Sequence, residues 1–233
     1  MIEPARNRGL AGDLPDLIGR SRLLDIMSRL GAAVLASPAA TFECATTPWH
    51  TTGTLRDDGH DTLNDLTVAA LTGGGIIRRD LRPSFGNRNG KASGPPLTLH
   101  ITLISDRDRT PLPGHVIYLW HCDTAGRYSL HDVPDANWLR GVGIADNNGR
   151  IRFTTIPPGR HDAGPPHMHF EIFPSAFPAI SGAPSIHTDR ITLPPALCQS
   201  AGATTFHTEL TVPAVRHMPP PQRHSHRPLP TLP

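Results

Sequence analysis

The sequence predicts an all-β protein, an antiparallel β-sandwich, and three observations support this prediction. Short segments in which apolar and polar residues alternate follow one another along most of the chain. The composition, with 26 Pro, 21 Gly and 37% hydrophobic residues in 233, favours short strands and many turns over long helices. Turn sequences such as Asn147-Asn148-Gly149 separate the segments. Together these features indicate a sandwich of short strands.

The strands are expected in the following order. Segment 97–103 opens the sheet, because its four apolar residues alternate cleanly with threonine and histidine. The Asn147-Asn148-Gly149 turn should join two later strands as a hairpin. Further proline and glycine clusters, at 157–159 and 164–166, bound a loop ahead of the last but one strand. The remaining strands are predicted at His115–Cys122, Leu139–Ala145, Arg150–Ile156, His167–Phe173 and Phe206–Val212.

The domain organisation predicted from the sequence is one β-sandwich domain over residues 46–215. Residues 1–45 are interpreted as a leader-like or disordered segment, because arginines precede the short apolar run Leu30–Ala36 in the order of a secretory leader. The same region, Leu17–Val34, also has apolar residues at helical spacing. A cytoplasmic location and export through a degenerate leader therefore both stay open. Residues 216–233 are rich in proline and histidine and should be disordered.

Composition narrows the classes of partner. The net charge is +2 with both signs interspersed, and aromatic residues make up 5%, so neither a basic surface nor a stacking platform for nucleic acid is expected. No apolar run has the length needed to cross a bilayer. Cys44, Cys122 and Cys198 lack metal-ligand spacing and are expected to be buried or free thiols, unless export allows one disulfide.

A histidine pair and a tyrosine are the strongest indication of function. His167 and His169 stand two residues apart in a predicted strand, so their side chains should share one face. Tyr128 precedes them in a turn sequence. Imidazole binds iron, copper and zinc, whereas a phenol ionises readily beside a trivalent cation. The combination of one tyrosine with two histidines therefore indicates ferric iron, Fe(3+).

The histidine pair alone would be weak evidence. With 14 histidines in the chain, a His-x-His triplet arises by chance roughly once. A second triplet, His224-Ser225-His226, lies in the tail. The sequence around His167 and His169 therefore has to support the prediction of a metal site.

The surrounding sequence resembles the intradiol ring-cleavage dioxygenases, non-haem ferric enzymes that open catechols between their two hydroxyl groups. The motifs occur in the family's order over roughly residues 95 to 175. They are Leu119-Trp120-His121-Cys122-Asp123, Ala125-Gly126-Arg127-Tyr128-Ser129, Leu139-Arg140-Gly141-Val142, Asp146 to Thr155, and Pro166 to Phe170. The resemblance implies the β-sandwich of that family, a small aromatic diol as substrate, and O2 as co-substrate.

The resemblance also implies the site residues. The iron in this family carries two tyrosinates and two histidines, so Tyr128 matches the tyrosinate that stays bound, and His167 and His169 match the imidazoles. The second tyrosinate is expected at position 161, where this chain has His161 as the candidate fourth ligand and catalytic base. The family's arginine near the substrate is replaced by Gly164. Tyr118, the other tyrosine, is expected to be a packed strand residue.

Three functions from different classes therefore remain open. The first is intradiol cleavage of a catechol-type aromatic, in which Tyr128 and His161 are the catalytic residues. The second is a metal-binding relative that has lost turnover, because His161 and Gly164 replace a tyrosine and an arginine. The third is a β-sandwich binding module in which the histidine pair is simply packed. The metal used in vivo, the particular catechol and the oligomeric state are not indicated by the sequence.

Overall fold

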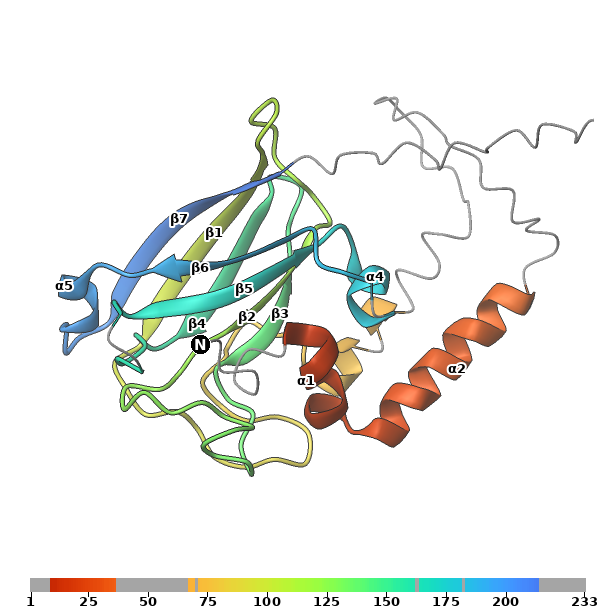
Figure 1. Ribbon diagram of the computed structural model, residues 1–233, viewed down its shortest axis with the longest axis horizontal. Helices are drawn as coiled ribbons and strands as arrows, with labels where there is room; N and C mark the ends of the chain where they lie inside the picture. Colours follow the sequence, from red (N-terminus) through yellow and green to blue (C-terminus); the bar gives the residue numbers. More distant parts are fainter. Residues whose placement is uncertain (1–8, 37–66, 70, 162–163, 182, 214–233) are drawn as a thin grey trace, which may run out of the picture.

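The computed structural model describes residues 9–36, 67–69, 71–161, 164–181 and 183–213. Its elements combine two short β-sheets with a few helices, and α1 lies beside the sheets while α2 extends away from them (Figure 1). The strands are β1 (Leu97–Ser105), β2 (Val116–Trp120), β3 (Arg140–Ile144), β4 (Arg150–Thr155), β5 (His167–Phe173), β6 (His187–Thr192) and β7 (Thr204–Val212). The helices are α1 (Gly9–Ile18), α2 (Arg20–Ala36), α4 (Ala176–Ile180) and α5 (Pro195–Cys198).

The strands of the described residues form two sheets. One sheet has the order β4-β1-β7 and the other the order β3-β2-β5-β6. Most neighbouring strands are antiparallel, as predicted, but β1 and β7 are parallel and pair from Leu97↔Thr204 to Ser105↔Val212. The expectation of a purely antiparallel arrangement is therefore wrong for this pair. The mainly β class is confirmed.

The two sheets share one hydrophobic core. Along β1 the residues alternate between buried and partly buried positions, as its sequence pattern predicted. In β5 the apolar residues between the two histidines and beyond them point into the same core. Buried members of this cluster include Leu99, Ile101 and Phe153 from the three-stranded sheet and Leu119, Met168 and Phe170 from the four-stranded sheet.

The turn at residues 147–149 differs from the predicted hairpin. The turn itself is present, and Gly149 takes a φ of +71° there. However, β3 pairs with β2 and β4 pairs with β1, so the turn carries the chain from one sheet to the other. The Asp146 carboxylate accepts the backbone N–H groups of Asn148 and Arg150 at 2.9 and 2.8 Å, which closes the turn without a ladder between its flanking strands.

Strand β6 was not predicted, because its sequence gives little signal. Of its six residues only Ile191 is buried, and the strand lies at the edge of the four-stranded sheet. An edge strand with one solvated face needs few apolar residues. The other predicted strands are present within a few residues of their expected ends.

In the N-terminal region, residues 9–36 form α1 and α2. Leu10, Leu14 and Leu17 of α1 are buried in a second hydrophobic cluster, on the face of the four-stranded sheet that points away from the other sheet. This cluster also contains Tyr118 and Trp120 of β2. The helical spacing noted in the sequence therefore has a structural counterpart, and α1 covers the face on which the β5 histidines lie.

Some sequence predictions lie outside the described residues. They concern Cys44, the tail 216–233, and the predicted boundary near residue 45 between the N-terminal segment and the β-sandwich domain. Within the described residues, Cys122 is buried and its thiol contacts the Gly159 carbonyl oxygen at 3.5 Å, while Cys198 is half-buried. None of the described helices combines the length and apolar character that spanning a bilayer requires.

Candidate metal centre

Strand β5 places the two predicted histidines on one face. His167 and His169 point away from the shared core, because Met168, Phe170 and Ile172 take the inward positions. Their rings are nearly perpendicular, with centroids 4.7 Å apart, and their Nε2 atoms are separated by 3.1 Å. Two nitrogens bound to one cation at about 2.1 Å and at a right angle to each other are about 3 Å apart. The pair therefore has the spacing of a chelating pair.

The orientation of His167 suits metal binding as well. Its Nδ1 lies 3.0 Å from the Pro165 carbonyl oxygen, a partner that can only accept a hydrogen bond. Nδ1 therefore carries the proton, and Nε2 presents a lone pair towards His169. Metal-binding histidines commonly donate their second N–H to a backbone carbonyl in this way.

Tyr128 lies in the turn that follows β2. Gly126 takes a φ of +81°, and the backbone N–H of Tyr128 donates to the Asp132 carboxylate at 2.8 Å. The side chain is 2% exposed. Its ring lies 6.3 Å from the His169 ring, measured between centroids. A residue from a turn about 40 positions earlier in the sequence is thus brought next to the β5 pair.

His161 approaches Tyr128 from the loop before β5. Its ring meets the Tyr128 ring edge to face at a centroid distance of 5.1 Å. His161 Nδ1 lies 2.7 Å from the Gly126 carbonyl oxygen, so Nδ1–H donates and Nε2 holds the lone pair. The loop packs tightly on the turn, because a Cβ on Gly126 would lie 2.5 Å from the Arg160 carbonyl oxygen. Glycine is required at that position.

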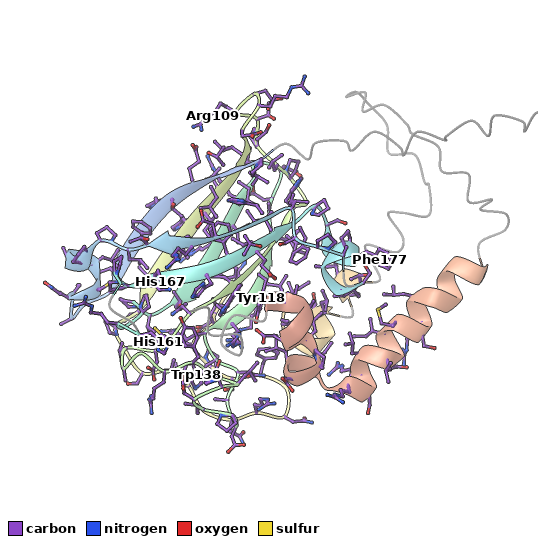
Figure 2. The ribbon with its side chains drawn as sticks, in the orientation of Figure 1. Arg109, Tyr118, Trp138, His161, His167 and Phe177 are labelled. Atoms are coloured by element: carbon purple, nitrogen blue, oxygen red, sulfur yellow. The ribbon has the colours of Figure 1, made fainter. Side chains whose placement is uncertain are left out.

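The structure therefore brings all four predicted site residues together. Tyr128 stands between His161 and His169, and His167 adjoins His169; Figure 2 shows His161 and His167 at the same end of the sheets. Within the described residues, no three side chains of His, Cys, Asp or Glu are grouped to hold a metal ion. A metal centre at this place consequently depends on the Tyr128 phenol in addition to the imidazoles.

Burial keeps the imidazoles near the pair neutral. Desolvation, reinforced by His167 and Arg190, lowers the pKa of His169 to about 4. Desolvation likewise lowers the pKa of His121 to about 4, although its hydrogen bond to the Cys122 carbonyl opposes the shift. A neutral imidazole is the form that binds a metal. At pH 7 His169 is therefore a neutral imidazole and not an imidazolium.

Two buried residues at the end of β2, Trp120 and His121, lie near the pair. Trp120 of β2 is the register partner of His169, and their rings stack with centroids 5.2 Å apart. His121 is 1% exposed, and Thr155 Oγ1 and the Cys122 carbonyl oxygen lie 2.7 and 2.8 Å from its two ring nitrogens. With both nitrogens engaged, His121 supports the site and does not bind in it. The strand register that pairs Trp120 with His169 was not visible in the sequence.

Sequence reasoning missed a buried ionic cluster on the same sheet face. Arg140 of β3 donates from Nη1 to Asp13 of α1 and to Tyr118 Oη, the latter at 3.2 Å, and Tyr118 Oη donates to Asp13 at 2.8 Å. Burial alone would lower the pKa of Arg140, but Tyr118 and Asp13 raise it above its ordinary value. Tyr118 is thus a packed strand residue, as expected. The signal in the sequence was a charged residue inside the otherwise uncharged strand segment Arg140–Ile144.

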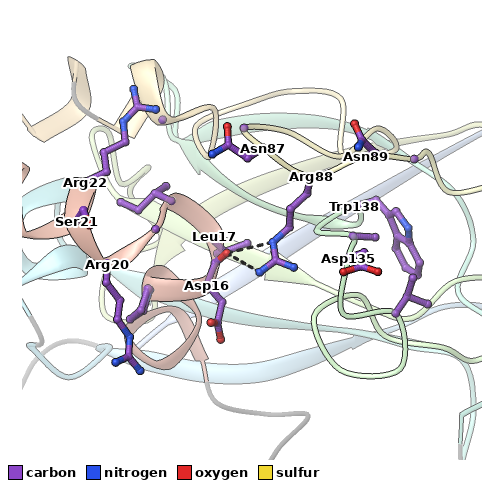
Figure 3. A pocket seen from close by; sticks show the side chains of 18 of the residues that line it. Asp16, Leu17, Arg20, Ser21, Arg22, Asn87, Arg88, Asn89, Asp135 and Trp138 are labelled. Atoms are coloured by element: carbon purple, nitrogen blue, oxygen red, sulfur yellow. Dashed lines mark hydrogen bonds between the residues drawn. The ribbon is translucent and has the colours of Figure 1, made fainter.

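A cleft of about 1110 Å3 lies at another place, between the α1–α2 junction and residues 86–91 (Figure 3). Arg88 crosses it and donates to the Asp16 carbonyl oxygen at 3.2 and 3.3 Å. Its lining includes none of the four candidate ligands. The cleft therefore lies apart from the histidine pair.

Comparison with known proteins shows the family of the chain. A family model described as Dioxygenase matches residues 80–203, which include all four candidate ligands. The protocatechuate 3,4-dioxygenase beta chain of Burkholderia cepacia is 34% identical over 107 residues, covering 39% of this chain and 45% of that protein. The catechol 1,2-dioxygenase of Acinetobacter baylyi is 33% identical over 100 residues, covering 34% and 32%. The chain thus spans less than half the length of these relatives.

Among solved structures, an intradiol ring-cleavage dioxygenase from Tetranychus urticae matches with a TM-score of 0.43 and 22% identity, over 53% of this chain and 61% of that one. Catechol 1,2-dioxygenase from Pseudomonas arvilla matches with a TM-score of 0.42 and 19% identity, over 90% and 82%. The family assignment comes from the sequence match. Because that match extends over more than half of the chain, the protein belongs to the dioxygenase family of the intradiol catechol and protocatechuate enzymes.

Proposed function

We propose that this protein is a non-haem ferric iron-dependent intradiol dioxygenase that cleaves a catechol-type aromatic with O2. The proposal assigns the iron to Tyr128, His161, His167 and His169. The observation that carries it is the series of ring contacts that joins His161 to Tyr128, Tyr128 to His169 and His169 to His167, with 3.1 Å between the Nε2 atoms of the β5 pair. Membership of the family supplies the reaction class.

The donor set fits ferric iron better than other common ions. A phenol beside a trivalent cation ionises readily, whereas a zinc site of this size would usually contain thiolates or further histidines. Two of the candidate imidazoles, those of His161 and His167, donate Nδ1–H to backbone carbonyls, which leaves the lone pair on Nε2. When bound, the iron would supply the Lewis-acid and redox chemistry that allows O2 to react with the catechol ring.

His161 is the residue that we assign to proton transfer. The hydrogen bond from its Nδ1–H to Gly126 fixes the tautomer that leaves a lone pair on Nε2. This nitrogen can accept a proton from a catechol hydroxyl group when the substrate binds. The edge-to-face contact with Tyr128 places that base beside the retained phenol. The buried Trp120 ring stacks on the His169 ring and so restricts the access of water to that face of the imidazole.

We also assign the two sheets to the β-sandwich of the intradiol dioxygenases. The shared core between β1, β4, β2 and β5 supports this assignment, since both sheets bury their inward residues in it. The candidate centre then lies on the outer face of the four-stranded sheet, under the turn that carries Tyr128.

A second function, a metal-binding relative without turnover, is favoured by one specific observation. His161 occupies the position of the second tyrosinate, and Gly164 occupies the position of an arginine near the substrate. Replacing a tyrosinate by an imidazole removes one negative charge from the metal ligands, which disfavours the ferric state. Loss of the arginine removes a cation that would orient an anionic substrate.

Oxygen consumption distinguishes the two functions. We expect the iron-loaded protein to consume O2 in the presence of catechol and to form a ring-opened dicarboxylate, with loss of both in His167→Ala. The double variant His161→Tyr/Gly164→Arg should turn over faster, because it restores the expected tyrosine and arginine. If the wild-type protein binds iron but neither it nor the double variant consumes O2 with catechol, the dioxygenase proposal is wrong and the relative without turnover remains.

A further inference from the structure

Arg140 is a buried cation with a complete set of partners near the candidate centre. It is 2% exposed, and all three of its side-chain nitrogens donate hydrogen bonds. A buried guanidinium is costly unless it is paired and hydrogen-bonded. The arrangement around Arg140 therefore needs an explanation beyond ordinary core packing.

Two of these hydrogen bonds end on the residue next to Tyr128. Arg140 Nη2 donates to the Ser129 carbonyl oxygen at 3.0 Å, and Nε donates to Ser129 Oγ at 3.2 Å. Ser129 Oγ in turn donates to the Trp138 carbonyl oxygen at 2.6 Å. A planar guanidinium with two bonds to one residue fixes both its position and its orientation. Arg140 consequently fixes the backbone from which the Tyr128 ring projects.

The countercharge for Arg140 comes from the N-terminal helix. Asp13 of α1 is 3% exposed and accepts hydrogen bonds from Arg140 Nη1 and from Tyr118 Oη. A second contact holds α1 on the sheet, because the Leu10 N–H donates to the Glu171 carboxylate at 2.8 Å. Glu171 lies two residues after His169 on the same face of β5. Helix α1 thus connects the strand of the histidine pair with the turn of the tyrosine.

We propose that Arg140, neutralised by Asp13, is the positioning residue for Tyr128, so that helix α1 is part of the structure that forms the metal centre. The inference rests on the proposed function in that Tyr128 is taken as an iron ligand. A buried ion pair contributes little net stability compared with an apolar pair of similar size. What the Asp13–Arg140 pair supplies is a fixed geometry for Ser129. Residues that orient metal ligands typically change metal affinity about 10- to 100-fold when they are replaced.

Arg127 provides a matched control. It adjoins Tyr128 on the other side in the sequence and pairs with Asp123 at 2.7 Å. Its side chain is 60% exposed, and the buried Asp123 carboxylate still accepts the backbone N–H groups of Ala125 and Arg127 when the Arg127 side chain is replaced. Arg127→Met removes an arginine charge next to Tyr128 but leaves every hydrogen bond of Ser129 in place.

The experiment compares wild type, Arg127→Met and the double variant Asp13→Asn/Arg140→Gln. The double variant removes both charges together, so that neither is left buried and unpaired. Circular dichroism checks that each variant is folded. If the double variant does not fold, it is replaced by Ser129→Ala, because this substitution removes the hydroxyl group that accepts the hydrogen bond from Arg140 Nε. Iron affinity and the tyrosinate-to-iron absorption band are measured on the iron-loaded proteins.

A second measurement uses the metal-free proteins. The chain has two tyrosines, so labelling tyrosine Cζ with 13C gives two NMR signals, which Tyr118→Phe assigns. We expect the Tyr128 signal to move in the double variant and to stay in place in Arg127→Met. We also expect the iron affinity of the double variant to be about tenfold lower, with a shifted absorption band.

The proposal is overturned if the double variant equals the Arg127→Met control in either the Tyr128 signal or the iron affinity. If wild type shows no tyrosinate-to-iron band, the proposed function fails on that result, and the metal-free NMR comparison alone decides the positioning role. A Tyr128 signal that moves only in the double variant then still supports that role, and an unmoved signal overturns it.

Discussion

Tyr128 and His161 meet edge to face with their ring centroids 5.1 Å apart, although the two strands β3 and β4 separate them in the sequence. The Gly126 carbonyl oxygen links the two residues, because it accepts the His161 Nδ1–H at 2.7 Å and belongs to the turn that carries Tyr128. The position expected for a second tyrosinate is thus filled by an imidazole whose ring contacts the Tyr128 ring.

His161→Tyr should restore the ligand set that the family resemblance implies. A second tyrosinate adds one negative charge beside the cation and stabilises the ferric state. We therefore expect a more intense visible absorption band per bound iron than in wild type, measured after iron loading. His131→Tyr, on an exposed ring outside the centre, is the control. Equal band intensity in wild type and His161→Tyr would show that residue 161 does not reach the iron.

His167→Ala and His169→Ala should each remove most of the bound iron. Both imidazoles are needed for chelation, because their Nε2 atoms form one pair at 3.1 Å. His207→Ala, in β7 of the other sheet, and His224→Ala or His226→Ala in the tail should leave iron binding unchanged. Metal content after dialysis measures the difference. Comparable losses in the strand and the control variants would contradict the assignment to β5.

Tyr118→Phe should lower the free energy of unfolding by about 1 to 3 kcal/mol, because it removes one donor to the buried Asp13 carboxylate. Desolvation, together with Asp13, raises the pKa of Tyr118 well above its ordinary value, so the phenol donates its proton at neutral pH. Urea unfolding followed by circular dichroism gives the change. A loss below about 0.5 kcal/mol would mean that water replaces the missing hydroxyl group.

Stability should fall as the pH falls through the ordinary imidazole pKa of 6.5, in part because of His100. Burial lowers the pKa of His100 most, and His207 and Arg152 lower it further. The imidazole rings of His100 and His207 stack with centroids 4.5 Å apart. A base with a lowered pKa binds fewer protons in the folded state than in the unfolded state. Its contribution to the free energy of unfolding is therefore present above the unfolded-state pKa and is lost as the pH falls below that value. His100→Gln should flatten the dependence in urea unfolding from about pH 5.5 to 7.5. An unchanged slope would contradict the assignment to His100.

The sequence predicted those strands whose apolar and polar residues alternate locally. The structure differs from the prediction where contacts between distant parts of the chain determine which strands pair. β1 and β5 were predictable because apolar and polar residues alternate along them. β6 was not, because a single buried residue, Ile191, anchors it. The 147–149 turn was found, but which sheet each flanking strand joins depends on pairing partners far away in the sequence.

The same distinction applies to the candidate centre. His167, His169 and Tyr128 could be predicted because their motifs are short and ordered along the chain. The Asp13–Arg140 pair could not, because its members are 127 residues apart and the N-terminal region was interpreted as a leader-like or disordered segment. Only the packing of α1 on the sheet brings Asp13 to Arg140.

The central claim is that Tyr128 binds ferric iron together with the β5 histidines, and the visible spectrum of the iron-loaded protein tests it most directly. We predict a tyrosinate-to-iron absorption band in wild type that changes when catechol is added, and no such band in Tyr128→Phe. Iron content is measured on both samples, so that loss of colour is compared at known occupancy. A band that persists in Tyr128→Phe, or an iron-loaded wild type without colour, would contradict the account.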